Sequence, residues 1–326
     1  MGRPTIVLGK EFYYPILATF GIPGNLLTIV ILSRGNCGLS KCITVYMVAM
    51  ATADLLVMVI NALIYHIFSN RFPLSFLTLT PVCKFILYMT FITFDLSVWF
   101  TVSFTFDRFV ALCCPRFNTR YCTQQTATIV ITAFSVFSFL KDIMVLFAYE
   151  TQNIINKVHR GCRASVAFFS SPLGTVSVWF HSACVVWIPF ILMTVFNLLT
   201  VHRILMANRA RRRLQGHRSE THSDPEMESR RKSSILLFSI SGIFILLWLT
   251  AALSFVTTRL TNTAYYRGDR TDPAYIATET GAFLKFLSCL QNPCIYAATQ
   301  RKFRDELKNV LKSPWTLIQR LCRKLG

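Results

Sequence analysis

Seven long blocks of apolar residues, separated by polar breaks, constrain this chain more than any other feature of its sequence. A helix needs about 20 consecutive apolar residues to cross a hydrocarbon core about 30 Å thick. Hydrophobic residues make up 53% of the 326 residues, and charged residues only 15%. The predicted spans are 12–33, 44–68, 82–112, 126–149, 173–206, 234–257 and 275–298. We therefore predict an all-α membrane protein in which residues 12–298 form a seven-transmembrane helix bundle.

The distribution of basic residues predicts the orientation of the bundle. The chain has 34 Lys and Arg against 15 Asp and Glu, a net charge of +19. These residues flank the apolar blocks and do not line one face among stacking aromatic residues, so we expect no nucleic-acid binding. The excess lies in segments that are cytosolic when the C-terminus is inside, among them a third loop at about 208–233. The positive-inside rule then predicts a short extracellular N-terminus, residues 1–11.

Residues 299–326 form the predicted cytosolic tail. Within it Phe303, Leu307, Val310 and Leu311 recur at helical spacing among charged residues. This pattern predicts a short amphipathic eighth helix on the inner leaflet. The alternative is a solvated tail without stable structure.

Four polar residues at mid-span positions form a candidate ion site. Ionisable groups inside spans cost about 2.5–3.5 kcal/mol each on insertion scales, so they are functional candidates by default. If the polar faces converge, Asp54, Ser97, Ser288 and Asn292 would form a cage of oxygen atoms that could hold a sodium ion with water. A structural hydrogen-bond network without an ion remains an equal alternative.

An acidic–basic pair, Asp107 and Arg108, ends the third span, and Cys83 begins it. The 25 residues from Cys83 to Arg108 correspond to about 37 Å of helix, one membrane crossing. A lone Arg at this depth more often anchors a helix at the interface. An outer cysteine and an inner Asp-Arg pair on one helix is a more specific pattern.

These motifs resemble those of rhodopsin-like (class A) G-protein-coupled receptors. The sequence DRF at 107–109 is similar to the DRY motif of that family, with Phe in place of Tyr, and NPCIY at 292–296 matches its NPxxY motif. Other family positions are occupied in the right spans and order by Gly24, Asn25, Asp54, Cys83, Pro189, Phe244 and Trp248. The resemblance covers about residues 12–311.

The resemblance implies a mechanism in which an extracellular ligand biases a two-state bundle. Arg108 would be held by Asp107 in the inactive state and released to meet a heterotrimeric G protein. The switch and coupling residues implied are Asp107, Arg108, Asn197, Phe244, Trp248, Asn292, Pro293 and Tyr296. The family also implies arrestin and receptor kinases as partners, and a disulfide between Cys83 and Cys162.

Two positions depart from the family pattern. Thr250 stands where the sixth span usually has Pro, so the usual hinge there is in doubt, and the fourth span lacks its usual Trp. Asn197, where most members have Tyr, and the third-span run at 97–108 resemble an orphan branch thought to sense aromatic amino acids.

Helix faces set by the motifs place a group of residues near an outer cavity: Thr90, Phe91, Phe94, His181, Trp248, Phe255, Glu279 and Lys285. Thr90 occupies the place of the carboxylate that holds biogenic amines in aminergic receptors, which argues against an amine. Lys285 and His181 suggest an anionic group beside aromatic surface. The alternative is internal pairing of Lys285 with Asp95 or Glu279.

Three alternatives to a receptor are an opsin, a seven-span pump or transporter, and an enzyme. In an opsin the retinal lysine lies six residues before the Asn of NPxxY, and Phe286 occupies that position. A seven-span pump or transporter would use Asp54, Asp95 and Lys285 as an ion path, but it would not explain Asp107-Arg108 and NPCIY. We expect no enzyme activity, because the chain has no HExxH, GxSxG or phosphate-binding glycine loop.

Overall fold

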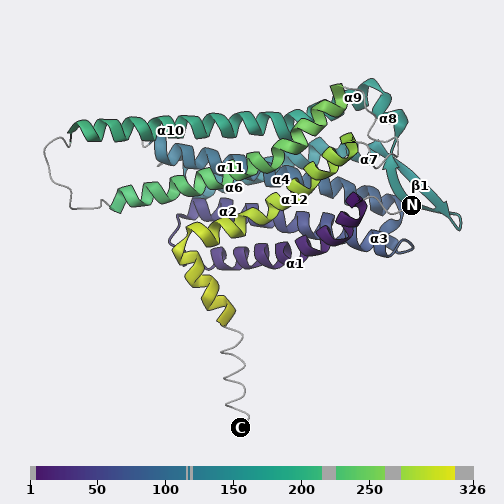
Figure 1. Ribbon diagram of the computed structural model, residues 1–326, viewed down its shortest axis with the longest axis horizontal. Coiled ribbons are helices and arrows are strands. Elements are labelled where there is room, and N and C mark those ends of the chain that lie inside the picture. Colours follow the sequence, from purple (N-terminus) through teal and green to yellow (C-terminus); the bar gives the residue numbers. More distant parts are fainter. Residues whose placement is uncertain (1–4, 115–116, 118–119, 215–224, 261–272, 313–326) are drawn as a thin grey trace, which may run out of the picture.

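The computed structural model of the chain describes residues 5–114, 117, 120–214, 225–260 and 273–312. It is a bundle of long helices that run side by side, with one two-stranded hairpin at one end (Figure 1). The long helical rods are α1 (Thr5–Ser33), α2 with η1 and α3 (Lys41–Val57, Met58–Phe68, Ser69–Arg71), α4 (Thr80–Cys113), α6 with η3 and α7 (Gln124–Lys141, Asp142–Met144, Val145–Ala148), α9 with η4 and α10 (Pro172–Ser182, Ala183–Trp187, Ile188–Leu214), α11 (Pro225–Leu260) and α12 (Pro273–Thr299).

Six of these rods, within the described residues, are long and apolar enough to cross a membrane. The seventh, α12, contains Glu279 and Lys285 and packs most extensively against α11. Its polar residues Glu279, Ser288, Gln291 and Asn292 are buried, as expected where a membrane helix carries function. The chain is a multi-pass seven-helix membrane protein.

The helices exceed the predicted spans at most ends. Helix α10 runs to Leu214 and α11 begins at Pro225, so much of the predicted loop at 208–233 is helical and residues 215–224 lie outside the described part. The predicted fourth span included Tyr149, which instead begins a strand. Apolar runs identify the membrane-crossing portion of a helix, whereas charged residues can continue the same helix beyond the bilayer.

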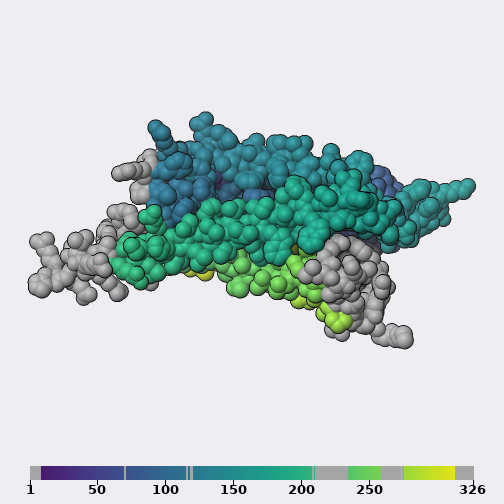
Figure 2. Space-filling view, turned by 90° about the horizontal axis from the view of Figure 1, so that it is seen from above, coloured from purple at the N-terminus to yellow at the C-terminus, as the bar shows by residue number. Residues whose placement is uncertain are grey.

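The hairpin of β1 (Tyr149–Ile155) and β2 (Val158–Ala164) was not predicted. It extends beyond the ends of the helices (Figure 2). Its two-residue turn is Asn156-Lys157, and both residues have positive φ, 51° and 63°. Positive φ at both central positions is the geometry of a type I′ turn, whose twist matches that of the paired strands. The strand nearest the bundle is tied to α4 by a disulfide between Cys83 and Cys162.

Short side chains begin two of the helical rods. Ser40 caps α2 by accepting from the backbone N–H of Ile43, and Thr123 caps α6 by accepting from that of Thr126. Such caps satisfy N–H groups that have no partner inside the helix. The fifth rod is distorted: its π-helical segment η4 ends at Trp187, two residues before Pro189, which has no N–H to continue the hydrogen-bond ladder.

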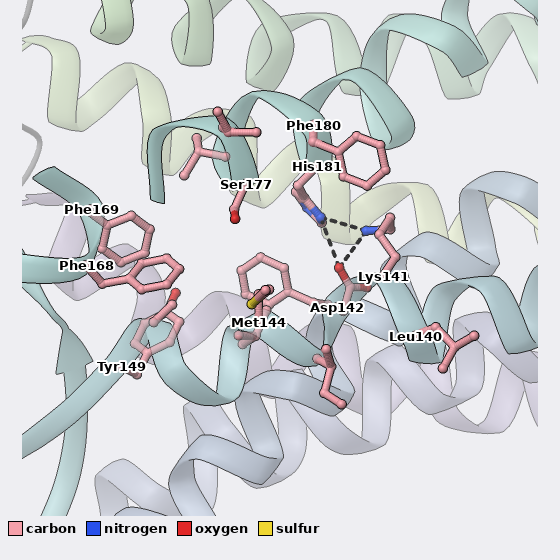
Figure 3. Close-up of a pocket in the computed structure, with 16 residues that line it drawn as sticks. Leu140, Lys141, Asp142, Met144, Tyr149, Phe168, Phe169, Ser177, Phe180 and His181 are labelled. Carbon is pink, nitrogen blue, oxygen red and sulfur yellow. Dashed lines mark hydrogen bonds and ion pairs between the residues drawn. The ribbon is translucent and has the colours of Figure 1, made fainter. Parts of the chain in front are cut away.

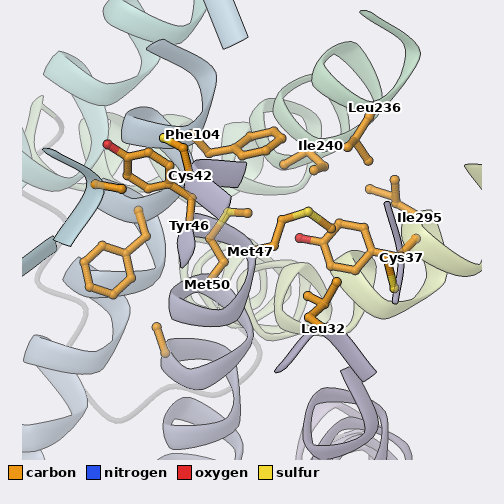
Figure 4. Close-up of a cluster of buried hydrophobic side chains, with 14 of the residues drawn as sticks. Leu32, Cys37, Cys42, Tyr46, Met47, Met50, Phe104, Leu236, Ile240 and Ile295 are labelled. Carbon is orange, nitrogen blue, oxygen red and sulfur yellow. The ribbon is translucent and has the colours of Figure 1, made fainter. Parts of the chain in front are cut away.

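The main core cluster joins α1, α2, α4, α11 and α12 at the end opposite the hairpin (Figure 4). Tyr46, Met47 and Phe104 are fully buried there, with Ile240 from α11 and Ile295 from α12. Residues 301–312 form a further helix, which leaves α12 at an angle (Figure 1). Phe303 of this helix is 3% exposed and contacts Tyr296, while its Leu307 and Val310 pack against the cluster. The amphipathic eighth helix therefore exists within the described part of the tail.

Candidate functional site

The polar centre of the bundle is the carboxylate of Asp54 on α2, which is 1% exposed. Ser97 of α4 donates to its Oδ1 at 2.6 Å, and Asn292 of α12 donates to its Oδ2 at 2.8 Å. Three helices thus meet at one carboxylate. The Oδ1 atom of Asn292 is buried and has no hydrogen-bond partner among the described residues.

Ser288, the fourth member of the predicted cage, bonds elsewhere. Its hydroxyl donates to the carbonyl of Lys285 at 2.6 Å and accepts from the indole Nε1 of Trp248 at 3.0 Å. Since Ser288 and Asn292 lie one helical turn apart on α12, they link the Trp248 indole to the Asp54 carboxylate through one helix. Of the four predicted residues, Ser97 and Asn292 both bond to Asp54, and Ser288 bonds to Trp248 instead.

Trp248 is surrounded by aromatic residues that the sequence had placed beside it. Its ring stacks on Phe244 with centroids 5.1 Å apart and meets Phe94 edge to face at 6.1 Å. The Lys285 ammonium lies 4.7 Å from the Phe94 ring centroid and 5.5 Å from that of Trp248. Residues of α4, α11 and α12 therefore form a compact aromatic group around one cation.

Neither acidic residue proposed as an internal partner of Lys285 contacts it. Asp95 pairs with Lys141 at 2.6 Å, and Glu279 pairs with Lys10 of α1 at 2.6 Å. No carboxylate of the described residues lies within 4.0 Å of the Lys285 ammonium, so aromatic faces are its nearest partners. The pairing alternative is wrong for this structure.

The eight predicted ligand residues fall into separate groups. Phe94, Trp248 and Lys285 are together, and Phe91 lies 5.0 Å from His181 between ring centroids. Two of the remaining members have other partners, since Phe255 packs on Trp179 and Glu279 pairs with Lys10. Thr90 is buried on α4. The expectation of a single shared cavity was made from helix faces alone, which do not fix side-chain direction.

The end opposite the hairpin contains Asp107 and Arg108, both buried. The Arg108 Nε donates to Asp107 Oδ2 at 3.0 Å, its NH2 group contacts the same oxygen, and the Cys42 thiol donates to Asp107 Oδ1 at 3.0 Å. Nearby, Asn197 of α10 donates to Ser241 of α11 at 2.8 Å. In this geometry the carboxylate of Asp107, the preceding residue, holds the Arg108 guanidinium.

The NPCIY segment lies against two other elements. Pro293 faces Gly24 of α1, where an added Cβ would lie 3.6 Å from its ring. Tyr296 is fully buried, and its hydroxyl has no hydrogen-bond partner among the described residues. A buried hydroxyl without a partner is costly. An arrangement of the helices in which the Tyr296 hydroxyl forms a hydrogen bond would be stabilised by that bond.

One charged cluster was not predicted. Lys141 of α6 places its ammonium 2.6 Å from Asp95, 2.5 Å from Asp142 and 2.9 Å from His181 Nδ1 (Figure 3). Asp95, Asp142 and His181 have ligand atoms close enough together to hold a metal ion, but the ammonium already lies among them. The sequence signal was available, because two adjacent charged residues interrupt the apolar run from Phe139 to Met144.

The disulfide predicted from the resemblance is confirmed. Cys83 and Cys162 are bonded, with Cα atoms 6.0 Å apart. The bond fixes β2 against the first turn of α4, and Thr80 reinforces it by donating to the Gly161 carbonyl at 3.0 Å.

Comparison with known proteins agrees with this geometry. The family model described as 7 transmembrane receptor (rhodopsin family) matches residues 24–296. A relative from Mizuhopecten yessoensis, named "Rhodopsin, G0-coupled", is 24% identical over 310 residues, covering 93% of this chain and 72% of that protein. With matching motifs, helices and disulfide in place, this chain belongs to the rhodopsin family of seven-transmembrane receptors.

Proposed function

We propose that this receptor binds an extracellular small molecule or short peptide at the hairpin end and activates a heterotrimeric G protein at the Arg108 end. As a family member it is a receptor and not an enzyme, and it signals through G proteins. The hairpin disulfide and the basic charge of the opposite end support an extracellular N-terminus and a cytosolic C-terminus.

One observation carries the proposal: a continuous set of contacts joins the aromatic group to the polar centre. Trp248 bonds to Ser288, and Asn292, one turn further along α12, bonds to Asp54, which bonds to Ser97 of α4. Helix α4 continues to Arg108. A ligand that repacks Trp248 would shift α12 against α2 and α4, and so bias the state of Arg108.

The surroundings of Lys285 favour an acidic ligand with an aromatic group. An ammonium whose nearest partners are ring faces gains from a carboxylate, because a charge out of water is stabilised by an opposite charge. Phe94 and Trp248 would supply aromatic contact area. This chemistry agrees with the resemblance to receptors thought to sense aromatic amino acids.

The proposal also includes a sodium ion at the polar centre, and arrestin and receptor kinases as cytosolic partners. A sodium ion would use a carboxylate oxygen of Asp54, the Ser97 hydroxyl and the Asn292 Oδ1 atom, which has no partner among the described residues. Sodium would thereby stabilise the state in which α2, α4 and α12 meet. Arrestin and receptor kinases would use the cytosolic face once Arg108 is released.

The test is a screen of aromatic amino acids and their acidic metabolites, with the full-length receptor and a purified G protein, measuring nucleotide exchange. An agonist should raise exchange in the wild type and fail in Arg108→Ala. Lys285→Met should lower the potency of an acidic agonist at least about tenfold, the equivalent of one charge-assisted contact, whereas Lys285→Arg should preserve much of it. Exchange that persists in Arg108→Ala would contradict the role of Arg108, and ion flux that survives this change would favour a transporter instead.

A further inference from the structure

A pocket lies at the hairpin end, on the flank of the bundle between α6–α7 and α9 (Figure 3). Its volume is about 450 Å³. Much of its lining is apolar, including Phe91, Met144, Phe168, Phe169 and Phe180. The volume falls within the range of about 300–1,000 Å³ typical of small-molecule sites.

The pocket is open toward the lipid side of the bundle. Leu140, Val176 and Phe180 line it and are 67%, 65% and 51% exposed. These residues belong to helices long and apolar enough to span a membrane, so hydrocarbon surrounds their exposed faces. A molecule dissolved in the bilayer could therefore enter from the side without crossing water.

The inner edge of the pocket is polar and tightly organised. The Lys141 ammonium has three N–H groups and contacts three acceptors, Asp95, Asp142 and the Nδ1 atom of His181. Nδ1 also lies 3.2 Å from Asp142 Oδ1, but its 2.9 Å contact with the ammonium is shorter, and an ammonium can only donate. We therefore assign Nδ1 as the acceptor of the Lys141 hydrogen bond, without a proton. A neutral His181 then has its proton on Nε2.

Two polar groups of α9 face the pocket without partners. None of the described residues bonds to His181 Nε2, and the His181 side chain is 32% exposed. Ser177, one turn earlier on the same face, also lines the pocket, and no described residue bonds to its hydroxyl (Figure 3). The Nε2–H group offers a hydrogen bond to an oxygen atom, and the Ser177 hydroxyl can donate a second or accept one.

We propose that this pocket binds a neutral amphiphile from the bilayer, with an acyl or aromatic body and a carbonyl or hydroxyl oxygen that accepts from His181 Nε2. The contacting charges determine the class. Asp95, Asp142 and Lys141 with a neutral His181 sum to −1, and the positive charge of Lys285, which also acts on His181, brings the sum to zero. Surroundings without net positive charge do not offset the desolvation of a carboxylate head, and an ammonium head cannot accept from an N–H group. The site is separate from the aromatic group at Lys285.

The probe is a monoacylglycerol that carries a photoreactive diazirine in its acyl chain, with the full-length receptor in phosphatidylcholine nanodiscs. Labelled peptides should map to residues 140–149 and 166–181. Ser177→Phe, which fills the pocket, should reduce labelling about tenfold or more. Its matched control is Thr175→Phe on the same helix, because Thr175 is exposed and does not line the pocket.

Two further variants test the hydrogen bond. His181→Leu should lower labelling about five- to tenfold, and His181→Gln, which keeps an amide donor, should retain more of it. An unfolding temperature equal to that of the wild type shows that a variant is folded. If a His181 variant does not fold, Ser177→Phe still tests the site.

Labelling that is the same in Ser177→Phe and the wild type, or that spreads over the whole lipid-facing surface, would overturn the site. A fatty acid with the same diazirine group provides the charged comparison. Stronger labelling by this fatty acid than by the monoacylglycerol would contradict the preference for a neutral head group. The measurement is binding and not nucleotide exchange, so its failure leaves the proposed receptor function standing, and the converse holds too.

Discussion

Asn292 of α12 donates a 2.8 Å hydrogen bond to Asp54 of α2, although the two residues are 238 positions apart in the chain. With Ser97 bonded to the other carboxylate oxygen, the contact ties α2, α4 and α12 together at mid-bundle. The hydrogen bonds of this single carboxylate therefore depend on the relative positions of three helices. Anything that competes for its oxygens changes how these helices pack.

Sodium should stabilise the purified receptor, and Asp54→Asn should remove that effect. A ligand at about ten times its Kd contributes about 1.4 kcal/mol to the native state, or about 2 °C in Tm for a protein of this size. Unfolding is measured in sodium chloride and in potassium chloride at equal ionic strength. An unchanged sodium response in Asp54→Asn would leave only a hydrogen-bond network.

Asp107→Asn should raise the basal activity of the receptor. Its carboxylate holds Arg108 and accepts from the Cys42 thiol. Weakening the charge pair by about 1.4 kcal/mol shifts a two-state equilibrium tenfold, so ligand-free nucleotide exchange should rise by up to that factor. Cys42→Ala, which removes only the weak thiol contact, is the matched control. Basal exchange equal to that of the wild type would contradict the role of Asp107 as the restraint on Arg108.

Gly281→Ala should destabilise the contact between α11 and α12. A Cβ atom at Gly281 would lie 2.6 Å from the Cα of Ala251 and 2.9 Å from its nitrogen, so the helix backbones must separate. Overpacking of this kind costs about 1–3 kcal/mol. The expected result is a lower Tm and a lower yield of folded receptor.

Gly242→Ala on α11 is the control for this change, since no atom of the described residues, apart from its own stretch of helix backbone, lies within 4 Å of its added Cβ. It should be neutral or stabilise the helix by up to about 1 kcal/mol. If both alanine variants unfold at the same temperature, the close approach of α11 and α12 does not contribute to stability.

Cys122, in the loop before α6, should react slowly with maleimides. Burial, together with the charge of Asp107 and a hydrogen bond to it, raises the pKa of this thiol to about 12. Because the thiol is neutral below its pKa, its thiolate fraction at pH 8 is on the order of 10³-fold below that of a free cysteine. Mass spectrometry of the labelled peptides should show a rate that rises about tenfold per pH unit from pH 7 to 9 without levelling off.

The unfolded chain provides the comparison, since there the same cysteine has an ordinary pKa near 8.5 and its rate levels off above it. Asp107→Asn should speed labelling of Cys122 in the folded protein, because it removes a nearby negative charge. A plateau below pH 10 in the native receptor would show that Asp107 and burial do not control this thiol.

Features marked by long apolar runs or by a specific motif could be predicted from the sequence. The bundle follows from the length of apolar runs, and the Cys83–Cys162 bond and the convergence of Asp54, Ser97 and Asn292 follow from the motifs. The hairpin was missed because its strands, such as Val158–Ala164, lack a clear alternation of apolar and polar residues. Its turn signal, Asn156-Lys157, is weak without glycine.

The helix and depth of a residue could be predicted better than the residues that its side chain contacts. Lys285 could pair with Asp95 or Glu279 by helix face, but Lys141 and Lys10 occupy those carboxylates. Lys141 and Asp142 were overlooked because no family motif marks them, although two charges in an apolar run are themselves informative. Ser288 faces Trp248 and not Asp54, a difference of side-chain direction that spacing along a helix cannot determine.

Retinal should not form a pigment with this receptor, although its relative from Mizuhopecten yessoensis is named a rhodopsin. The position of the opsin lysine is occupied by Phe286, which is 3% exposed and packs against Phe94 and Tyr14. Lys285, the neighbouring residue, lies about 100° further around the helix, with its ammonium over Phe94 and Trp248. Retinal added to the membranes should give no absorption band in the visible range, while an authentic opsin treated in parallel should. A visible band that disappears in Lys285→Met would mean that this lysine forms the Schiff base and that the aromatic group around it is a chromophore site.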